Sequence, residues 1–168
     1  MAIELTHEGT LPFENGYLIF DKSRIAGGFF LMDMTNISIT DIPEDEPVPR
    51  RRLRNHLKSD DFFHVDKYPN TQLRITETKI ISAHKIRATA NLTIKDVTKP
   101  VSFIINRIKK SASLPYRYRT HLTINRFNWN ISYQGSYWER ISSIIDNNLV
   151  DTDINLRIDI VISSYYQE

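Results

Sequence analysis

The side chains best suited to chemistry in this chain are five histidines and two pairs of neighbouring carboxylates. The histidines lie at positions 7, 56, 64, 84 and 121, and none has the HxH or HExxH spacing that places two metal ligands on one element. The chain has no cysteine, so thiol ligands, thiol nucleophiles and disulfides are excluded. A metal site would need distant histidines to converge, which the sequence does not indicate.

The carboxylate pairs are Asp60 with Asp61 and Asp151 with Asp153. Neighbours on a turn point in different directions, and residues two apart on a strand share one face, so we interpret both pairs as solvated charge. The chain lacks a glycine-rich phosphate loop and a GxSxG nucleophile motif. Its adjacent glycines, Gly27–Gly28, lie in a strand pattern, where we predict a bulge or a close backbone approach. These patterns predict that the protein is not an enzyme.

A run of basic residues follows directly on a run of acidic ones. Glu44–Glu46 is acidic, and the next segment carries five basic side chains, Arg50, Arg51, Arg52, Arg54 and Lys58. We interpret the two runs as neutralising each other; a patch for anionic lipid head groups and an RNA-binding patch are the alternatives. The net charge is +2, from 22 basic and 20 acidic residues, so the composition predicts no nucleic-acid partner.

Length and composition predict one domain with a hydrophobic core. The chain has 168 residues, 40% of them hydrophobic and 25% charged, so residues 1–168 are expected to form a single domain. No apolar stretch reaches the roughly 18 residues that span a bilayer, and we expect no membrane-spanning segment. The start of the chain, MAIELTHEGT, has neither a basic leader nor an apolar run, so it predicts no secretory signal.

Alternation of apolar and polar residues predicts that most of the chain is β-strand. From Val150 to Ile162 the odd positions are mainly Asp, Asn and Arg and the even ones mainly aliphatic, which indicates one solvated face. The pattern recurs at Ile86–Ile94, and a loop of about four to six residues closed by Pro100 is expected to lead into Val101–Ile105. Further strands are predicted at Tyr17–Phe20, Ile25–Met34, Asn36–Asp41, Thr71–Thr78, Tyr116–Asn125 and Asn130–Tyr133. Such consecutive strands predict an antiparallel barrel or sandwich.

Two short helices are expected between these strands. Arg50–Ser59 carries Leu53 and Leu57 four residues apart, enough for one contact ridge, and we expect this helix to cover one end of the fold. Ser136 and Glu139 have the capping-box spacing that begins a helix. The predicted fold class is therefore all-β with one or two short helices.

Three motifs together resemble those of the YceI-like family, lipocalin-like bacterial proteins that hold polyisoprenoid lipids. They are HLKSDDFFHVDKYP at 56–69, LTIKDVTKP at 92–100 and INRF at 124–127, and the resemblance runs from about His7 to Ile162. It implies an antiparallel lipocalin-like β-barrel of about eight strands. Most of the family's first strand, which precedes a His-x-Gly motif found here at His7–Gly9, is expected to be missing. One barrel edge would then need protection or a pairing partner.

A ligand is expected to bind in the barrel interior. Small inward side chains such as Ala88, Ala90 and Thr120 leave space between larger ones. The predicted pocket-lining residues are Phe30, Met32, Met34, Ala88, Ala90, Phe103, Tyr116, Tyr118, Leu122, Trp129, Ile154, Ile158 and Ile160. A solid core of the same residues is the alternative, and the resemblance favours a tunnel. Trp129 stands near the family's glycine-containing turn, so we expect it to plug or line the pocket.

The resemblance implies that the protein binds or carries an isoprenoid-type or other long-chain lipid, with no other cofactor. The candidate head-group contacts are Tyr116, Tyr118, Arg107, Arg117 and Arg119, although outward solvation explains the arginines equally well. Two alternatives stay open: a filled-barrel structural or adaptor domain that acts through its exposed edge, and a lipid-modifying enzyme. The resemblance implies a periplasmic location, while a cytoplasmic location and a homodimer are also compatible with the sequence.

Overall fold

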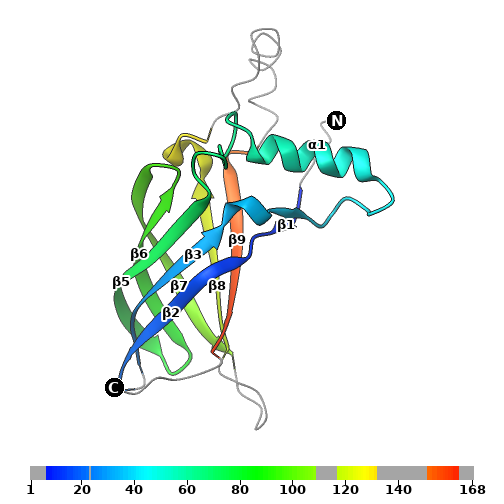
Figure 1. The fold of residues 1–168 in the computed structure, drawn as a ribbon. Helices are drawn as coiled ribbons and strands as arrows, with labels where there is room; N and C mark the ends of the chain where they lie inside the picture. Colours follow the sequence, from blue (N-terminus) through cyan, green and yellow to red (C-terminus); the bar gives the residue numbers. More distant parts are fainter. Residues whose placement is uncertain (1–6, 23, 109–116, 132–150, 163–168) are drawn as a thin grey trace.

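A strongly curled antiparallel sheet forms the body of the molecule (Figure 1). The computed structural model describes residues 7–22, 24–108, 117–131 and 151–162. The main sheet has seven strands in the order β2-β3-β5-β6-β7-β8-β9, with antiparallel neighbours. Their bounds are β2 Phe13–Asp21, β3 Arg24–Asp33, β5 Asn70–Ser82, β6 Lys85–Ile94, β7 Val97–Ile108, β8 Arg117–Asn125 and β9 Asp153–Val161. The expectation of an all-β antiparallel fold is confirmed, and in the described residues the sheet is a half-barrel because β2 and β9 are not hydrogen-bonded to each other.

The one α-helix of the described residues, α1 (Pro47–Lys58), agrees with the helix predicted at Arg50–Ser59. Its prolines lie in the first turn, where a missing N–H leaves no helical hydrogen bond unmade. No residue of α1 is buried, and its contacts with the core come from the last turn, where Leu57 packs against the core and the centroid of the His56 ring lies 5.9 Å from that of the Phe62 ring. The helix therefore extends beyond the sheet (Figure 1), and the expected cover of one end holds only for its last turn. No helix in this described part of the chain has the length and apolarity needed to cross a bilayer.

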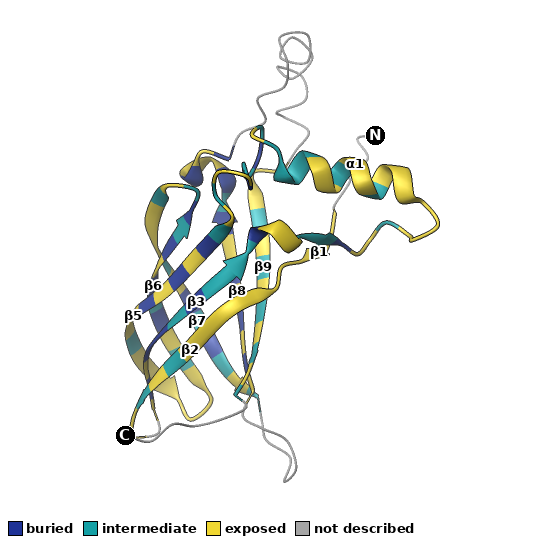
Figure 2. Cartoon of the chain, viewed as in Figure 1, coloured by how far each residue is buried: buried dark blue, intermediate teal, exposed yellow. Residues whose placement is uncertain are grey.

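Strand alternation places the core on the concave face of the sheet. Tyr118, Thr120, Leu122 and Ile124 of β8 are buried, and the residues between them are exposed. Figure 2 shows the same alternation of buried and exposed positions along β5 and β6, whereas β2 is largely exposed. Ala88 is fully buried and pairs across the sheet with Phe103, so a small side chain makes room for a large one. The residues predicted to point inward on these strands therefore lie on the concave face, where the core is.

The glycine pair behaves as predicted. Ile19 pairs with Gly27 but Phe20 pairs with Ile25, so Ala26 is an extra residue and the strand bulges there. A Cβ atom added at Gly28 would lie 2.9 Å from the Tyr17 carbonyl oxygen. Both the bulge and the close backbone approach are therefore present, and they increase the local bend of β2 and β3.

The hairpin between β6 and β7 is tighter than expected. Ile94 pairs with Val97, so the loop contains only Lys95 and Asp96, and Lys95 adopts a positive φ of 55°. Pro100 lies within β7 and not in the loop, which corrects the prediction. A proline is tolerated there because this part of β7 lies outside the segment, Asn106–Ile108, that pairs with β8.

The strand predicted at Asn130–Tyr133 is wrong at its first residues. Asn130 has the left-handed backbone conformation, with φ 54°, and ends the short 3-10 helix η2 (Arg126–Trp129). This helix begins where the side-chain oxygen of Asn125 accepts the Phe127 N–H at 3.1 Å. Such local side-chain bonds compete with strand pairing. Tyr133 and the helix predicted from Ser136 lie outside the described residues.

The strand predicted at Asn36–Asp41 is shorter than expected. Only β4 (Ser38–Ile39) is extended, and it pairs with β1 (Gly9–Thr10) in a small second sheet. The Asp33 side chain accepts the Thr35 N–H at 2.8 Å and so begins the 3-10 helix η1 (Met34–Asn36). The chain therefore leaves the main sheet before Met34.

Candidate functional site

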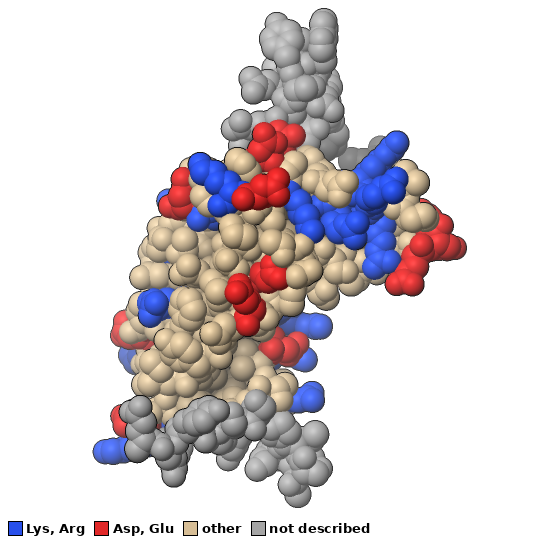
Figure 3. Space-filling model, in the orientation of Figure 1, with Lys and Arg blue, Asp and Glu red and all other residues tan. Residues whose placement is uncertain are grey.

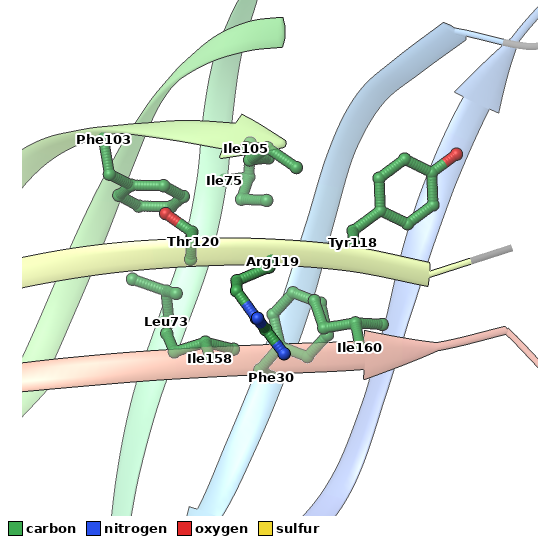
Figure 4. Close-up of a pocket in the computed structure, with 10 residues that line it drawn as sticks. All are labelled: Phe30, Leu73, Ile75, Phe103, Ile105, Tyr118, Arg119, Thr120, Ile158 and Ile160. Atoms are coloured by element: carbon green, nitrogen blue, oxygen red, sulfur yellow. The ribbon is translucent and has the colours of Figure 1, made fainter. Parts of the chain in front are cut away.

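A small apolar cavity lies on the concave face of the sheet (Figure 4). Strands β3, β5, β7, β8 and β9 supply its lining, which consists of Phe30, Leu73, Ile75, Phe103, Ile105, Tyr118, Arg119, Thr120, Ile158 and Ile160. Its volume is about 10 Å³, roughly the room that one water molecule needs. The cavity alone is therefore too small for a lipid tail.

Most of the predicted pocket-lining residues lie in or beside this cavity. Those that line it are Phe30, Phe103, Tyr118, Ile158 and Ile160. Those that belong to the same buried cluster, or pack against it, are Met32, Ala88, Ala90, Leu122, Trp129 and Ile154. Tyr116 lies outside the described residues. That these residues contact a lipid stays a prediction.

The positions of Met34 and Trp129 do not follow from strand parity alone. Met34 is buried but does not belong to the core cluster, because η1 takes the chain away from the sheet at this residue. Trp129 is 3% exposed, and its indole N–H donates to the Leu92 carbonyl oxygen at 3.1 Å. Trp129 is therefore a buried aromatic residue at the η2 end of the interior, and its role as a plug or lining of a ligand site stays a prediction.

An apolar opening runs along the two outer strands of the sheet. The inward residues of β9 are only half-buried, although the inward residues of the neighbouring strand β8 are buried. Leu18 and Phe20 of β2 are half-buried in the same way and also pack against the core. We call these inward residues of the two unpaired edges the seam: Leu18, Phe20, Ile154, Leu156, Ile158 and Ile160. Along the seam, apolar surface of the inner face still meets solvent.

Thr120 places a buried hydroxyl in the cavity wall. Its Oγ1 is buried and makes no hydrogen bond, and Figure 4 shows this oxygen turned toward the Phe103 ring. A buried hydroxyl without a partner costs about 1–3 kcal/mol. A water molecule or a polar group of a ligand would remove that cost. Sequence reasoning assigned Thr120 only a small volume, although a threonine hydroxyl at an inward position of a strand was a signal.

The three candidate head-group arginines do not lie on one face. Arg119 lies on the exposed face, where its Nε donates to Asp159 Oδ1 at 2.6 Å, and that hydrogen bond lowers the pKa of Asp159. Arg117 pairs with the exposed Val161 and shares its outer face. Arg107 pairs with the buried Tyr118, which places it on the inner face at the end of β7. Arg119 also borders the cavity, but its side chain binds Asp159 on the outer face, so Arg107 is the candidate whose register places it on the inner face.

The motif at 56–69 has a structural role in the described residues. The Ser59 hydroxyl donates to the His56 carbonyl oxygen at 2.8 Å and ends α1. His64 adopts a positive φ of 50°, and its N–H donates to the Ser59 carbonyl oxygen at 2.7 Å. This turn places Phe62 in the core, where it is 8% exposed. The motif thus joins the helix to the end of the sheet, and the described residues contain no group of three metal-ligating side chains.

Sequence reasoning missed the buried guanidinium of Arg126. This side chain is fully buried, and burial lowers its pKa. Nε donates to the Asp151 carbonyl oxygen at 3.1 Å and Nη1 to the Ile131 carbonyl oxygen at 3.0 Å. The signal was the motif at 124–127, where Arg126 continues the inward alternation of β8. Arg126 therefore ties η2 to the start of β9 and does not face the seam.

Comparisons with known proteins agree with this geometry. The model of the YceI-like domain matches residues 1–162. The crystal structure of BcnA from Burkholderia cenocepacia is similar with a TM-score of 0.70 and 17% identity, over 90% of this chain and 84% of that one. The YCEI protein of Campylobacter jejuni has a TM-score of 0.67 and 18% identity, over 98% of this chain and 89% of that one. No curated protein matches the chain.

Proposed function

The chain belongs to the YceI-like family, and from this premise we propose that it binds and carries an amphipathic lipid with a long apolar tail of isoprenoid type. The observation that carries the proposal is the seam, an apolar strip that stays half-exposed along β2 and β9. Half-exposed aliphatic residues on the inner face of a sheet gain free energy when a ligand covers them. Each CH₂ group transferred from water contributes about 0.8 kcal/mol.

The cavity volume limits where such a tail would lie. The cavity on the concave face has room for about one water molecule, so it cannot hold a chain of many carbons. We therefore place the tail along the seam, between β2 and β9, where Ile158 and Ile160 connect it to the cavity. The head group would lie at the rim beside Arg107, and Thr120 offers a hydroxyl further inside.

The proposal is tested by extracting the purified protein with organic solvent and weighing the intact form by native mass spectrometry. We expect an isoprenoid-type lipid at close to one molecule per chain. An apo mass with no extractable lipid, after expression in an isoprenoid-rich host, would contradict the proposal.

Ile160→Asn and Val161→Asn form a matched pair of variants for the seam. Both replace an aliphatic residue of β9, but Ile160 lines the cavity whereas Val161 is 48% exposed on the other face. Burying an amide without a partner is unfavourable, so I160N is expected to lower lipid occupancy about tenfold or more. V161N is expected to leave occupancy within about twofold of the parent. Equal occupancy in both variants would place the lipid elsewhere.

A filled-barrel adaptor is the second candidate, and two observations favour it. The cavity is small, and β2 and β9 each have one edge without a strand partner in the described residues. Unpaired edges bind extended segments of other proteins through backbone hydrogen bonds. A protein that never yields lipid but acquires an ordered strand at these edges would belong to this class.

We propose binding in preference to catalysis. Thr120 and Arg126, the buried polar residues of β8 and η2, do not form an acid–base pair, and Arg126 is held by backbone carbonyl oxygens. A lipid-modifying activity would require a titratable pair at the cavity wall. The periplasmic location implied by the family resemblance stays a prediction.

A further inference from the structure

A second hollow lies between α1 and the segment that follows β4. Its volume is about 410 Å³, and its lining consists of Ser38, Ile39, Glu44, Pro47, Arg50, Arg51 and Arg54. This volume is large enough for a small ligand, but the hollow is an open groove on the surface and not an enclosed pocket. None of these residues lines the cavity in the sheet interior. We call this hollow the basic groove.

Three arginines give the basic groove its charge. Arg54 follows Arg50 by four residues and Arg51 by three, which places the three side chains on one side of α1. The helix sequence contains no acidic residue, so no carboxylate within α1 offsets them. Figure 3 shows Lys and Arg side chains gathered over this helix. Like charges at this spacing destabilise a helix slightly, and a bound anion would relieve their repulsion.

The neighbouring acidic run does little to neutralise the groove. Arg50 Nη1 lies 3.5 Å from Glu44 Oε1, and the Glu44 side chain is 92% exposed, so this ion pair is weak. It is the only ion pair of the described residues that joins the acidic run to the basic run. Within the described residues, the side chains of Arg51 and Arg54 make no ion pair or hydrogen bond. Two guanidinium groups at the groove are therefore available to a ligand.

We propose that the basic groove binds a phosphate or diphosphate group. The planar guanidinium fork of arginine matches the geometry of phosphate oxygens and forms paired, charge-assisted hydrogen bonds with them. Ser38 adds a hydroxyl donor on the opposite wall of the groove. The group would come from a soluble phosphate ester or from the head group of an anionic membrane lipid. The proposal does not depend on lipid binding in the sheet interior, and either one holds if the other fails.

The test compares two variants that remove one positive charge from the same helix. Arg54→Gln removes an arginine of the groove, and Arg52→Gln removes an exposed arginine that does not line it. The affinity is measured by isothermal titration calorimetry of the full chain with pyrophosphate at low salt. R54Q is expected to weaken binding about tenfold, and R52Q by less than about twofold. R54K should give an intermediate value because lysine keeps the charge but loses the fork.

Co-sedimentation with vesicles of phosphatidylcholine, with and without phosphatidic acid, identifies the source of the phosphate. If the parent protein binds the acidic vesicles and R54Q binds them more weakly, the phosphate belongs to a lipid head group. If the parent binds pyrophosphate but not the vesicles, the phosphate belongs to a soluble ester. Equal losses in R52Q and R54Q would overturn the proposal, because they would mean diffuse attraction without a site. The proposal would also be overturned if the parent protein bound neither pyrophosphate at millimolar concentration nor the acidic vesicles.

Discussion

Arg107 carries the sharpest prediction about a single residue. Its register opposite Tyr118 places it on the inner face, whereas Arg117 lies on the outer face near the same end of the sheet. Removing a charge-assisted hydrogen bond to a polar head group costs about 1.5–3 kcal/mol. Arg107→Gln is therefore expected to weaken binding of a lipid with an anionic head group about tenfold, and Arg117→Gln to leave it nearly unchanged. Fluorescence titration with such a lipid measures both, and equal effects would contradict a head group at this rim.

Thr120 carries the second prediction. Its buried Oγ1 has no partner, so replacement by the similarly shaped valine removes an unpaired polar atom and adds apolar contact. Thr120→Val is expected to raise the free energy of unfolding of the lipid-free protein by about 1 kcal/mol, measured by urea denaturation. A loss of stability would mean that the hydroxyl is satisfied by a buried water molecule.

The predictable part of the site is the part that follows strand parity. Phe103, Tyr118 and Ile160 line the cavity because alternate residues of a strand share one face. Met34 departs from the prediction because the Asp33 side chain accepts the Thr35 N–H and starts the 3-10 helix η1 at Met34, where the strand was expected to continue. The unpaired state of the Thr120 hydroxyl depends on every neighbour of that atom, and no pattern along the sequence contains that information.

At the scale of elements, a charge cluster links β8 to β9. Arg119 and Arg157 both contact the Asp159 carboxylate, at 2.6 Å and 3.2 Å, and the Arg119 hydrogen bond lowers its pKa below the ordinary 3.8. A lowered folded-state pKa stabilises the fold above the unfolded-state value, and this stabilisation is lost as pH falls through the folded-state pKa.

Asp159→Asn should therefore cost stability at pH 7 and cost nothing at a pH well below the folded-state pKa of Asp159. Because the group is exposed, the loss at pH 7 should stay below about 1 kcal/mol. Thermal unfolding over pH 2–7 measures it, with Asp153→Asn as the control on the same strand. A loss that persists at the lowest pH would assign the effect to packing.

Strands were easier to predict than the turns that join them. Nine residues of β9 alternate along their whole length, so periodicity alone finds the strand. Pro100 was expected in a loop because proline lacks a donor, but at that point one side of β7 has no strand partner among the described residues. The exposure of a strand edge depends on the order of strands in the sheet, which a local pattern does not encode.

At the scale of the whole molecule, the number of strands decides what the seam can accept. Six antiparallel steps lead from β2 to β9, so the two edge strands run in the same direction (Figure 1). Direct pairing between them would be parallel, in an otherwise antiparallel sheet. An extended segment placed between them would be antiparallel to both. A lipid tail, in contrast, would cover their side chains and leave the backbone edges unpaired.

Hydrogen exchange therefore distinguishes the carrier from the adaptor. In the free protein, the amides of β2 and β9 are expected to exchange at least about tenfold faster than those of the central strands β5 and β6, because each edge strand has one neighbour among the described strands. Adding lipid should change this ratio little, since a tail makes no backbone hydrogen bonds. The amides of both edge strands could instead become as protected as those of β6, to an extent that increases with the concentration of the protein or of an added peptide. That result would show that a further strand closes the sheet, and it would favour the adaptor.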